Sequence, residues 1–269
     1  METILAEPLV VQEKDSSDLE IIHELDISHI ETEDGKPLDN TFSERQQHLL
    51  IDAIHASWQA PKGKPFVALS NVGLFYGLHK PPVVSDFMLS LGVEFPNNAW
   101  EKHNRAYFTW EYGKLPELAI EIVSNVRGNE LDEKLDLYAF IGIQNYIVFD
   151  PAGHYGSDTL RLFVLKNNEY YRSESSMLQG LELACTLWTG TYQAMTDTWL
   201  RWTTPDGTLL LTGEERAEQE QERAEHERER AEHERERAEE AIALATEERL
   251  RAERLAQRLR ELGINPEEV

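Results

Sequence analysis

Residues 117–151 read ELAIEIVSNVRGNELDEKLDLYAFIGIQNYIVFDP, and they carry the clearest alternation of predicted strand and helix in the chain. ELAIEIVS (117–124) is a short apolar run, which predicts a strand. Residues 129–143 place Leu131, Leu135 and Tyr138 at helical spacing. NYIVFDP (145–151) is typical of a buried strand that Pro151 ends. The order of strand, helix and strand predicts a helix packed against a sheet.

The flanking sequence extends this pattern on both sides. TFSERQQHLLIDAIHASW (41–58) is an amphipathic helix that the following PKGKP ends. Extended runs follow in FVALS (66–70), VGLFYG (72–77) and VVSDFMLSLGV (83–93). LRLFVL (160–165) and NEYYRS (168–173) predict a hairpin. We therefore expect residues 41–212 to form a mixed α/β domain with helices against a central sheet.

The two ends differ in composition from this domain. Residues 1–40 carry twelve acids and two bases without a sustained period, so we expect a largely disordered acidic arm. Residues 213–262 repeat alanine every seven positions and predict one long helix, followed by a tail at 263–269. We expect the domain to stay folded without residues 213–269.

The long helix can be read in two ways. In its first three repeats the residues that should complete a coiled-coil seam with alanine are Glu220, Glu227 and Glu234, which favours a solvated single helix. Apolar residues gather only further on, from Ile242 to Leu259. A short coil through residues 238–262 would make the chain a homo-oligomer, and both readings stay open.

Composition limits the class of protein. The chain has 269 residues and one cysteine, so it has neither an internal disulfide nor a zinc–cysteine site, and a reducing compartment is expected. We find no apolar run long enough to span a bilayer and no secretory signal pattern, so we expect a soluble cytoplasmic protein without a membrane partner.

The formal charge of −24 argues against a nucleic-acid partner, because phosphate binding normally uses a basic surface. The ends carry most of this charge: residues 1–40 contribute −10 and residues 213–269 contribute −8, which leaves −6 for residues 41–212. A bound cation would offset part of that remainder. Acidity therefore weakens a nucleic-acid hypothesis without excluding it.

Two carboxylates lie inside otherwise apolar strands. Burying a charge is costly unless a cation, hydrogen bonds or a proton compensates. Strand alternation places Asp86 on the face of Val84 and Met88, and Glu121 on the face of Ala119 and Val123. Two carboxylates on neighbouring strands would form an oxygen site suited to Mg²⁺.

A lysine on the following helix completes this cluster. A rotation of 100° per residue places Lys134 between Leu131, Tyr138 and Ile141, on the apolar side of the helix. A lysine there needs an anionic partner, and the strand acids are candidates. Each of the three residues alone is more often an ordinary salt-bridged side chain, but their combination is more specific.

At these residues the chain resembles the PD-(D/E)XK restriction-endonuclease-like superfamily, and within it the bacterial Uma-two endonuclease family. The resemblance rests on Ser85-Asp86, on Glu121 in AIEIVS, and on Lys134 in the helix before NYIVFDP, within about residues 41–200. Two positions depart from the superfamily motif. Ser85 replaces a proline that supplies no ligand, and Val123 stands where the motif has lysine, so the resemblance implies that Lys134 takes that role.

The resemblance implies a Mg²⁺-dependent endonuclease acting on DNA, with Mn²⁺ as a substitute ion. Asp86 and Glu121 would bind the metal, which polarises a phosphate oxygen and activates water, and Lys134 would orient that water. Glu44 matches a position where relatives often add an acidic ligand. Asn125 and Arg127, in the loop after the second strand, could contact substrate, although ordinary turn roles suit them better.

Two other classes remain open. A catalytically silent relative of the same fold would bind nucleic acid or a protein partner and oligomerise through the C-terminal helix, and cation binding at Asp86 and Glu121 distinguishes it from the nuclease. Alternatively, the two carboxylates could be the acid and base of a glycoside hydrolase, with Trp188, Trp199 and Trp202 lining a cleft. A core of about 160 residues is small for that class, and these tryptophans are better suited to packing.

Overall fold

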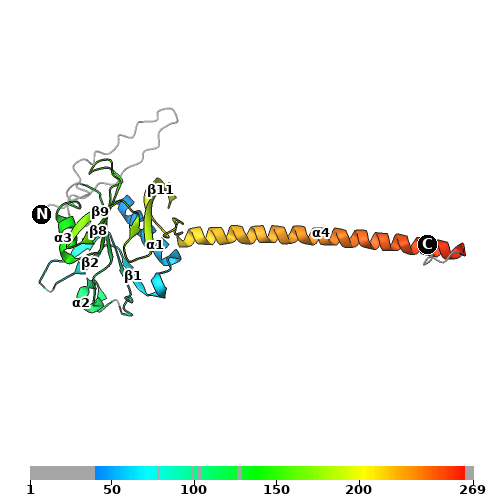
Figure 1. Ribbon diagram of the computed structural model, residues 1–269, viewed down its shortest axis with the longest axis horizontal. Coiled ribbons are helices and arrows are strands. Elements are labelled where there is room, and N and C mark those ends of the chain that lie inside the picture. The colour runs from blue at the N-terminus through cyan, green and yellow to red at the C-terminus, as the bar shows by residue number, and fades with distance from the viewer. Residues whose placement is uncertain (1–39, 78, 99, 102–103, 126–128, 264–269) are drawn as a thin grey trace, which may run out of the picture. The chain divides into compact units, whose positions relative to one another are not determined.

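The structure, a computed structural model, describes residues 40–263 except 78, 99, 102–103 and 126–128. Its centre is a six-stranded sheet in the order β1-β4-β6-β7-β8-β9 (Figure 1). These strands are β1 (Phe66–Leu69), β4 (Phe87–Leu91), β6 (Leu118–Ile122), β7 (Asn145–Phe149), β8 (Leu160–Lys166) and β9 (Glu169–Ser173). Among the described strands of this sheet, only β6 and β7 pair in parallel, and α3 (Glu133–Ile141) connects them. The predicted strand–helix–strand unit and the mixed α/β class are confirmed.

The alternation of side chains along the strands gives the sheet two apolar faces. The first face packs against α1 (Thr41–Ser57) and against a second sheet of β10 (Met177–Leu178), β11 (Leu183–Tyr192) and β12 (Met195–Thr203). Phe87, Ile120 and Phe149 of the central sheet meet Leu50 and Trp202 there. Trp202 is completely buried in this layer, and Trp199, equally buried, stacks on Phe42 of α1, so neither lines a cleft.

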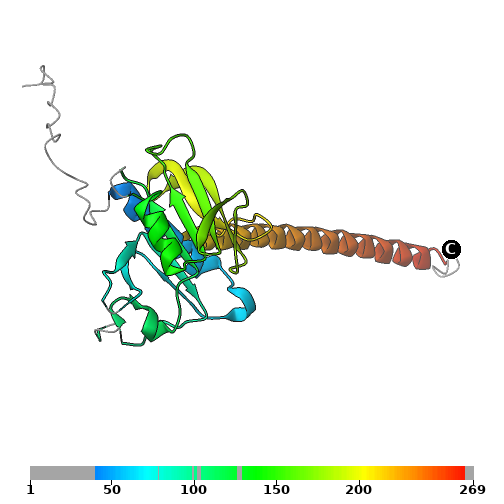
Figure 2. The same ribbon diagram turned by 60° about the vertical axis from the view of Figure 1, so that its left-hand side comes forward.

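The other face packs against α3 and a small sheet of β3 (Val83–Ser85), β2 (Val72–Phe75) and β5 (Tyr107–Phe108). Met88, Ala119 and Val148 of the central sheet contribute to this layer, which also contains Tyr138 of α3. Figure 2 shows α3, in green, in front of the strands of the sheet. The short helices η1 (Pro61–Gly63) and α2 (Thr109–Tyr112) lie in the connections.

Local signals fix the ends of the main elements. The Asn40 side chain accepts a hydrogen bond from the Ser43 N–H at 2.8 Å and caps α1. The hairpin of β8 and β9 turns at Asn167 and Asn168, which both have positive φ, as the tight turns that match strand twist require. This hairpin was predicted from the sequence.

The run 83–93 is not the single strand that its composition predicts. Its first three residues, β3, pair with β2 in the small sheet, whereas β4 pairs with β1 and β6 in the central sheet. Asp86 lies at the bend between the two segments. The face assigned to it together with Val84 and Met88 is therefore wrong, because the chain changes sheets at this residue: Val84 is 37% exposed and Met88 is buried.

The long helix α4 spans Gly213–Glu261, close to the predicted range 213–262. The Thr212 hydroxyl accepts from the Glu215 N–H at 3.2 Å, and the Glu215 carboxylate accepts from the Thr212 N–H at 2.8 Å. Arg201 of β12, which is 1% exposed, donates to both Glu215 oxygens at 2.7 and 2.6 Å. The first turn of α4 is therefore attached to the domain.

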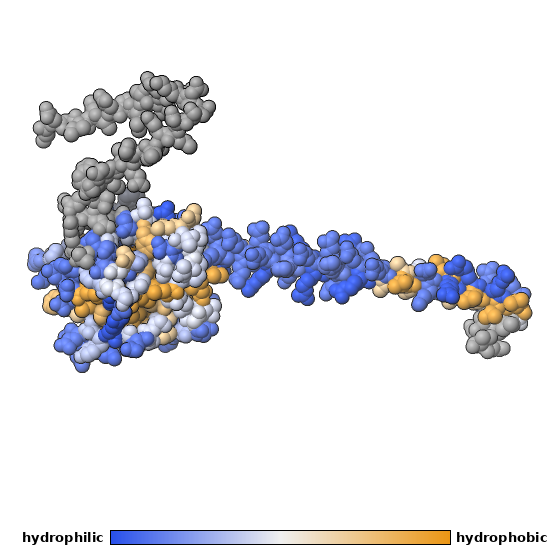
Figure 3. Space-filling model, turned by 90° about the horizontal axis from the view of Figure 1, so that it is seen from above, coloured by the Kyte–Doolittle hydropathy of each residue, from blue (hydrophilic) through white to orange (hydrophobic). Residues whose placement is uncertain are grey.

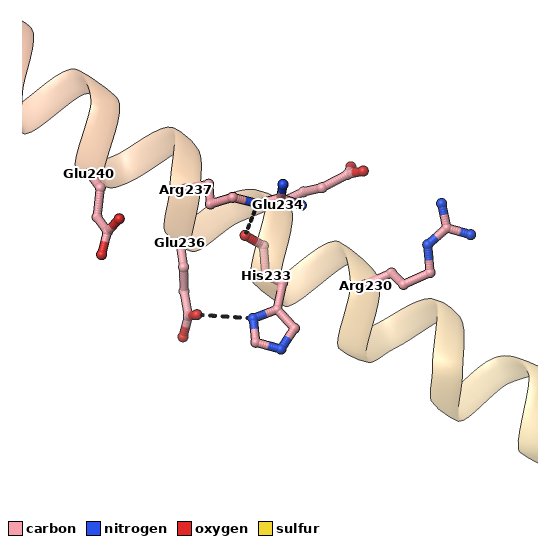
Figure 4. A pocket seen from close by; sticks show the side chains of 6 residues that line it. All are labelled: Arg230, His233, Glu234, Glu236, Arg237 and Glu240. Carbon is pink, nitrogen blue, oxygen red and sulfur yellow. Dashed lines mark hydrogen bonds and ion pairs between the residues drawn. The ribbon is translucent and has the colours of Figure 1, made fainter.

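Beyond that turn α4 is exposed, and no residue between Gly213 and Glu261 is buried. Figure 3 shows hydrophilic side chains along most of the helix and apolar ones in its C-terminal part. In the middle, His233 contacts Glu236 at 3.5 Å, and Arg237 donates to the His233 carbonyl (Figure 4). The hollow of about 450 Å³ there is lined by α4 side chains alone, so it is the space between neighbours on one helix.

Among the described residues, no helix is long and apolar enough to cross a membrane. The expected arm, residues 1–40, lies outside the described part of the chain apart from Asn40, as does most of the expected tail at 263–269.

Candidate active site

Asp86 and Glu121 meet because β4 and β6 are neighbours in the central sheet. Phe87 pairs with Ile120 in the antiparallel register, so Asp86, one residue before β4, comes level with Glu121. The Asp86 Oδ2 atom accepts a hydrogen bond from the Ile122 N–H at 2.5 Å. The first carboxylate is thereby fixed to the strand that carries the second, as the prediction of neighbouring strands requires.

Glu121 is held by one face of α3. The carboxylate is 2% exposed, with Lys134 Nζ 2.8 Å from Oε2 and the Tyr138 hydroxyl donating to Oε1 at 2.7 Å. Lys134 and Tyr138 are four residues apart, one helical turn, and therefore point to the same side of α3. The predicted direction of Lys134 is confirmed, because its ammonium group reaches the strand acid.

Burial and charge shift the ionisation of this cluster. Burial raises the pKa of Glu121, although Lys134 and the Tyr138 hydrogen bond partly counteract it. Burial by itself lowers the pKa of Lys134, but the charge and hydrogen bond of Glu121, together with the charges of Asp86 and Glu130, outweigh it, and the net shift is upward. Burial and the neighbouring Glu121 raise the pKa of Tyr138 well above its usual value. Lys134 is therefore a cation at neutral pH, and Tyr138 is a neutral hydrogen-bond donor.

Two side-chain amides, linked by hydrogen bonds, support Asp86. The Gln47 side-chain amide donates to Asp86 Oδ1 at 3.3 Å, and Asn71, between β1 and β2, donates to Gln47 Oε1 at 2.9 Å. Gln47 is buried on the face that Leu50 and Ile54 share. Sequence reasoning missed Gln47, although an amide at this helical phase of an amphipathic helix was a usable signal.

Glu130 is a third carboxylate near the cluster, and it was also missed. It is 5% exposed, and its Oε2 accepts from the Tyr155 hydroxyl at 2.9 Å. Its charge raises the pKa values of both Glu121 and Lys134. Three acids, Asp86, Glu121 and Glu130, therefore act on the single ammonium group of Lys134.

The comparison with family models finds a match that covers much of the chain. The family Uma2, described as "Putative restriction endonuclease", matches residues 21–188, which is more than half of the chain. The chain belongs to the Uma2 family. A comparison with curated proteins found no match. The Uma2 match contains the segments that carry Asp86, Glu121 and Lys134, and ends within β11.

The structure does not bring Glu44 to the cluster of Asp86, Glu121 and Lys134. Its carboxylate is half exposed and faces His48 Nδ1 at 3.4 Å. Within the described part of the chain, no three His, Cys, Asp or Glu side chains are grouped so that they could hold a metal ion. Of the residues on α1, it is Gln47 that contacts Asp86.

Of the two loop residues predicted to contact substrate, the structure describes Asn125 but not Arg127. Asn125 follows β6 and donates to the Ser124 hydroxyl at 3.2 Å, which is a local turn contact. Arg127 lies outside the described residues. Asp150, just after β7, is completely buried and accepts from the His154 and Tyr155 N–H groups at 2.9 and 2.7 Å, which gives it a structural role.

The donor set fits a divalent cation with few protein ligands. Carboxylate oxygens are the hard ligands that Mg²⁺ prefers, and each oxygen has more than one lone pair, so the observed hydrogen bonds leave acceptor capacity. The charges of Asp86, Glu121 and nearby Glu130 exceed that of Lys134, which favours binding of an additional positive charge. The cluster therefore offers two ligands, and water or substrate would supply the others.

Proposed function

We propose that this Uma2 member is an endonuclease that hydrolyses phosphodiester bonds of DNA with the help of Mg²⁺, for which Mn²⁺ can substitute. The observation that carries the proposal is the convergence of Asp86, Glu121 and Lys134 where α3 meets β4 and β6. Two carboxylates and a lysine are the groups that metal-assisted phosphodiester hydrolysis needs.

In this proposal Asp86 and Glu121 hold the cation between neighbouring strands. When bound there, Mg²⁺ would act as a Lewis acid on a phosphate oxygen and lower the pKa of a water molecule. The chain itself fixes both carboxylates before substrate arrives: Ile122 and Gln47 orient Asp86, and α3 orients Glu121. Such preorganisation reduces the reorganisation that the reaction would otherwise require.

Lys134 supplies positive charge at the open side of the cluster. Its side chain is 28% exposed, whereas Glu121 is 2% exposed, so a substrate can approach the lysine more easily than the glutamate. Because Lys134 stays protonated, it acts as a hydrogen-bond donor and cation rather than as a base. Its role is to orient the attacking water and to offset the charge that develops on the phosphate.

The loop after β6 would contact the substrate. Asn125 is partly exposed next to the strand that carries Glu121, and Arg127 follows two residues later in the sequence. An arginine there would bind a phosphate oxygen through its planar donor group. We assign Asn125 and Arg127 to substrate binding, without a part in the chemical step.

The test is cleavage of plasmid, single-stranded DNA and RNA with Mg²⁺ or Mn²⁺ by wild type, Asp86→Asn and Glu121→Gln. Both variants keep the shape of the side chain and remove its charge. Glu44→Gln is the matched control, since this acid is exposed and paired with His48. We expect loss of DNA cleavage and of calorimetric cation binding in the first two variants, and retention of both in Glu44→Gln.

Other outcomes would overturn the proposal in identifiable ways. Cleavage of RNA alone would change the substrate. Loss of activity in Glu44→Gln would add this residue to the ligands. A folded wild type that neither cleaves nor binds a cation would instead indicate a nuclease-fold module that binds nucleic acid or a protein partner.

A further inference from the structure

The C-terminal half of α4 carries an uncovered apolar face. Leu255 is 58% exposed and Leu262 is 70% exposed, while helix residues of this kind normally pack against a neighbour. Residues alternately three and four apart lie on one side of the helix, as in a coiled-coil seam. We call them the α4 seam: Ala238, Ala241, Ala245, Glu248, Ala252, Leu255, Leu259 and Leu262.

The charge of the helix changes where this seam begins. Residues 213–237 carry eleven acids and six bases, and glutamate fills every second position that the seam would need. Residues 238–262 carry six acids and five bases, so their net charge is −1 against −5 for the first half. Two copies of the second half can therefore approach each other with little net repulsion, unlike two copies of the first half.

We propose that the α4 seam binds the same seam of a second copy of this chain, in an antiparallel pair centred at Leu250. An antiparallel pairing about this point places Ala238 opposite Leu262, Ala245 opposite Leu255 and Ala241 opposite Leu259. Each of these layers joins one small and one large side chain, which gives a uniform separation between the two helices. A parallel pair would place alanine on alanine and leucine on leucine, and the separation would vary along the helix.

The one charged residue of the seam also favours the antiparallel direction. In a parallel pair Glu248 would face Glu248 of the second copy, and two like charges would be buried together. In the antiparallel pair it faces the second copy's Ala252, and Arg249 and Arg251 flank the seam on its two sides at that level. An acid between arginines is a favourable arrangement at the centre of the pair.

Sedimentation of the full chain tests the association. We expect a dimer at micromolar concentration and at least a tenfold weaker association for Leu255→Glu, which places a charge in the seam. Leu250→Glu is the matched control, because Leu250 is also a half-exposed leucine of α4 but lies on the opposite side of the helix. A monomeric wild type, or equal weakening by both substitutions, would overturn the proposal.

Disulfide cross-linking tests the direction. Ala245→Cys combined with Leu255→Cys should form dimers linked between copies, whereas each single variant should not. In the antiparallel pair a residue at 245 lies about 15 Å along the axis from its own counterpart, too far for a disulfide. Cross-linking of the single variants would show a parallel pair. The native Cys185 does not interfere, since it is 2% exposed and burial raises the pKa of its thiol to about 12.

Discussion

Replacing Lys134 with methionine removes the cation of the proposed site and keeps the length of the side chain. Glu121, which is 2% exposed, then keeps only the Tyr138 hydrogen bond, beside the charges of Asp86 and Glu130. Breaking a buried ion pair from one side costs about 3–5 kcal/mol. We expect a loss near the lower end, about 3 kcal/mol of the free energy of unfolding at pH 7, because Lys134 is 28% exposed.

Urea unfolding followed by circular dichroism measures this loss, and the chain offers a matched control. Arg172 and Asp158 form an ion pair of the same 2.8 Å length, but their side chains are 52% and 48% exposed. Arg172→Met should cost about 0–1 kcal/mol. Adding Glu121→Gln to Lys134→Met removes the uncompensated charge and should recover most of the loss. Equal effects of the two single substitutions, or no recovery in the double variant, would show that the uncompensated charge of Glu121 is not the cause of the loss.

The loss should also depend on pH. Burial already holds the pKa of Glu121 above its unfolded value, and removing Lys134 removes a group that lowers it. An acid with a raised pKa in the folded state contributes stability below its unfolded pKa and loses it as the pH rises through the folded pKa. The deficit of Lys134→Met is therefore largest near neutral pH and should shrink as the pH falls towards about 4. A deficit that is constant between pH 7 and pH 4 would contradict this account.

Two further predictions concern groups that support the site and the long helix. Tyr138→Phe leaves one oxygen of the buried Glu121 carboxylate without its hydrogen-bond donor, so we expect the free energy of unfolding in urea to fall by about 2 kcal/mol. The loss should be smaller for Tyr146→Phe, because the Tyr146 hydroxyl donates to a neutral carbonyl. Truncation at residue 213 leaves the buried Arg201 guanidinium without Glu215, whereas a chain ending at residue 218 keeps the pair. Thermal unfolding should show the shorter chain less stable, and equal melting temperatures would exclude an energetic role for this contact.

Much of the fold could be predicted because local patterns and tertiary structure agree in it. The run 117–151 has one interpretation at each step, and the hairpin of β8 and β9 carries its turn residues in the sequence. The run 83–93 could not be resolved, because a change from one sheet to another at Asp86 leaves the apolar composition of the segment unaltered.

In the site, too, local patterns predicted some residues, and tertiary packing decides the others. The position of Lys134 on the apolar face of its helix was enough to predict that it points towards the strand acids, because that face packs against the sheet. Gln47 was not found because its contact with Asp86 depends on how α1 is placed relative to β4, across 39 residues of sequence. Tyr138 was assigned to apolar packing, and only the position of Glu121 shows that its hydroxyl has a polar partner.

Because α3 is short, the arrangement of the site depends on how α3 packs against the rest of the domain. A helix of nine residues is too short to persist alone in water, and Asp132, the N-cap of α3, makes no side-chain capping hydrogen bond. Its helical state therefore depends on the contacts that Tyr138 and Lys134 make with β6. Local opening of this segment would separate Lys134 from Glu121 in one event, so Asp86, Glu121 and Lys134 stay together only while α3 is packed on the central sheet.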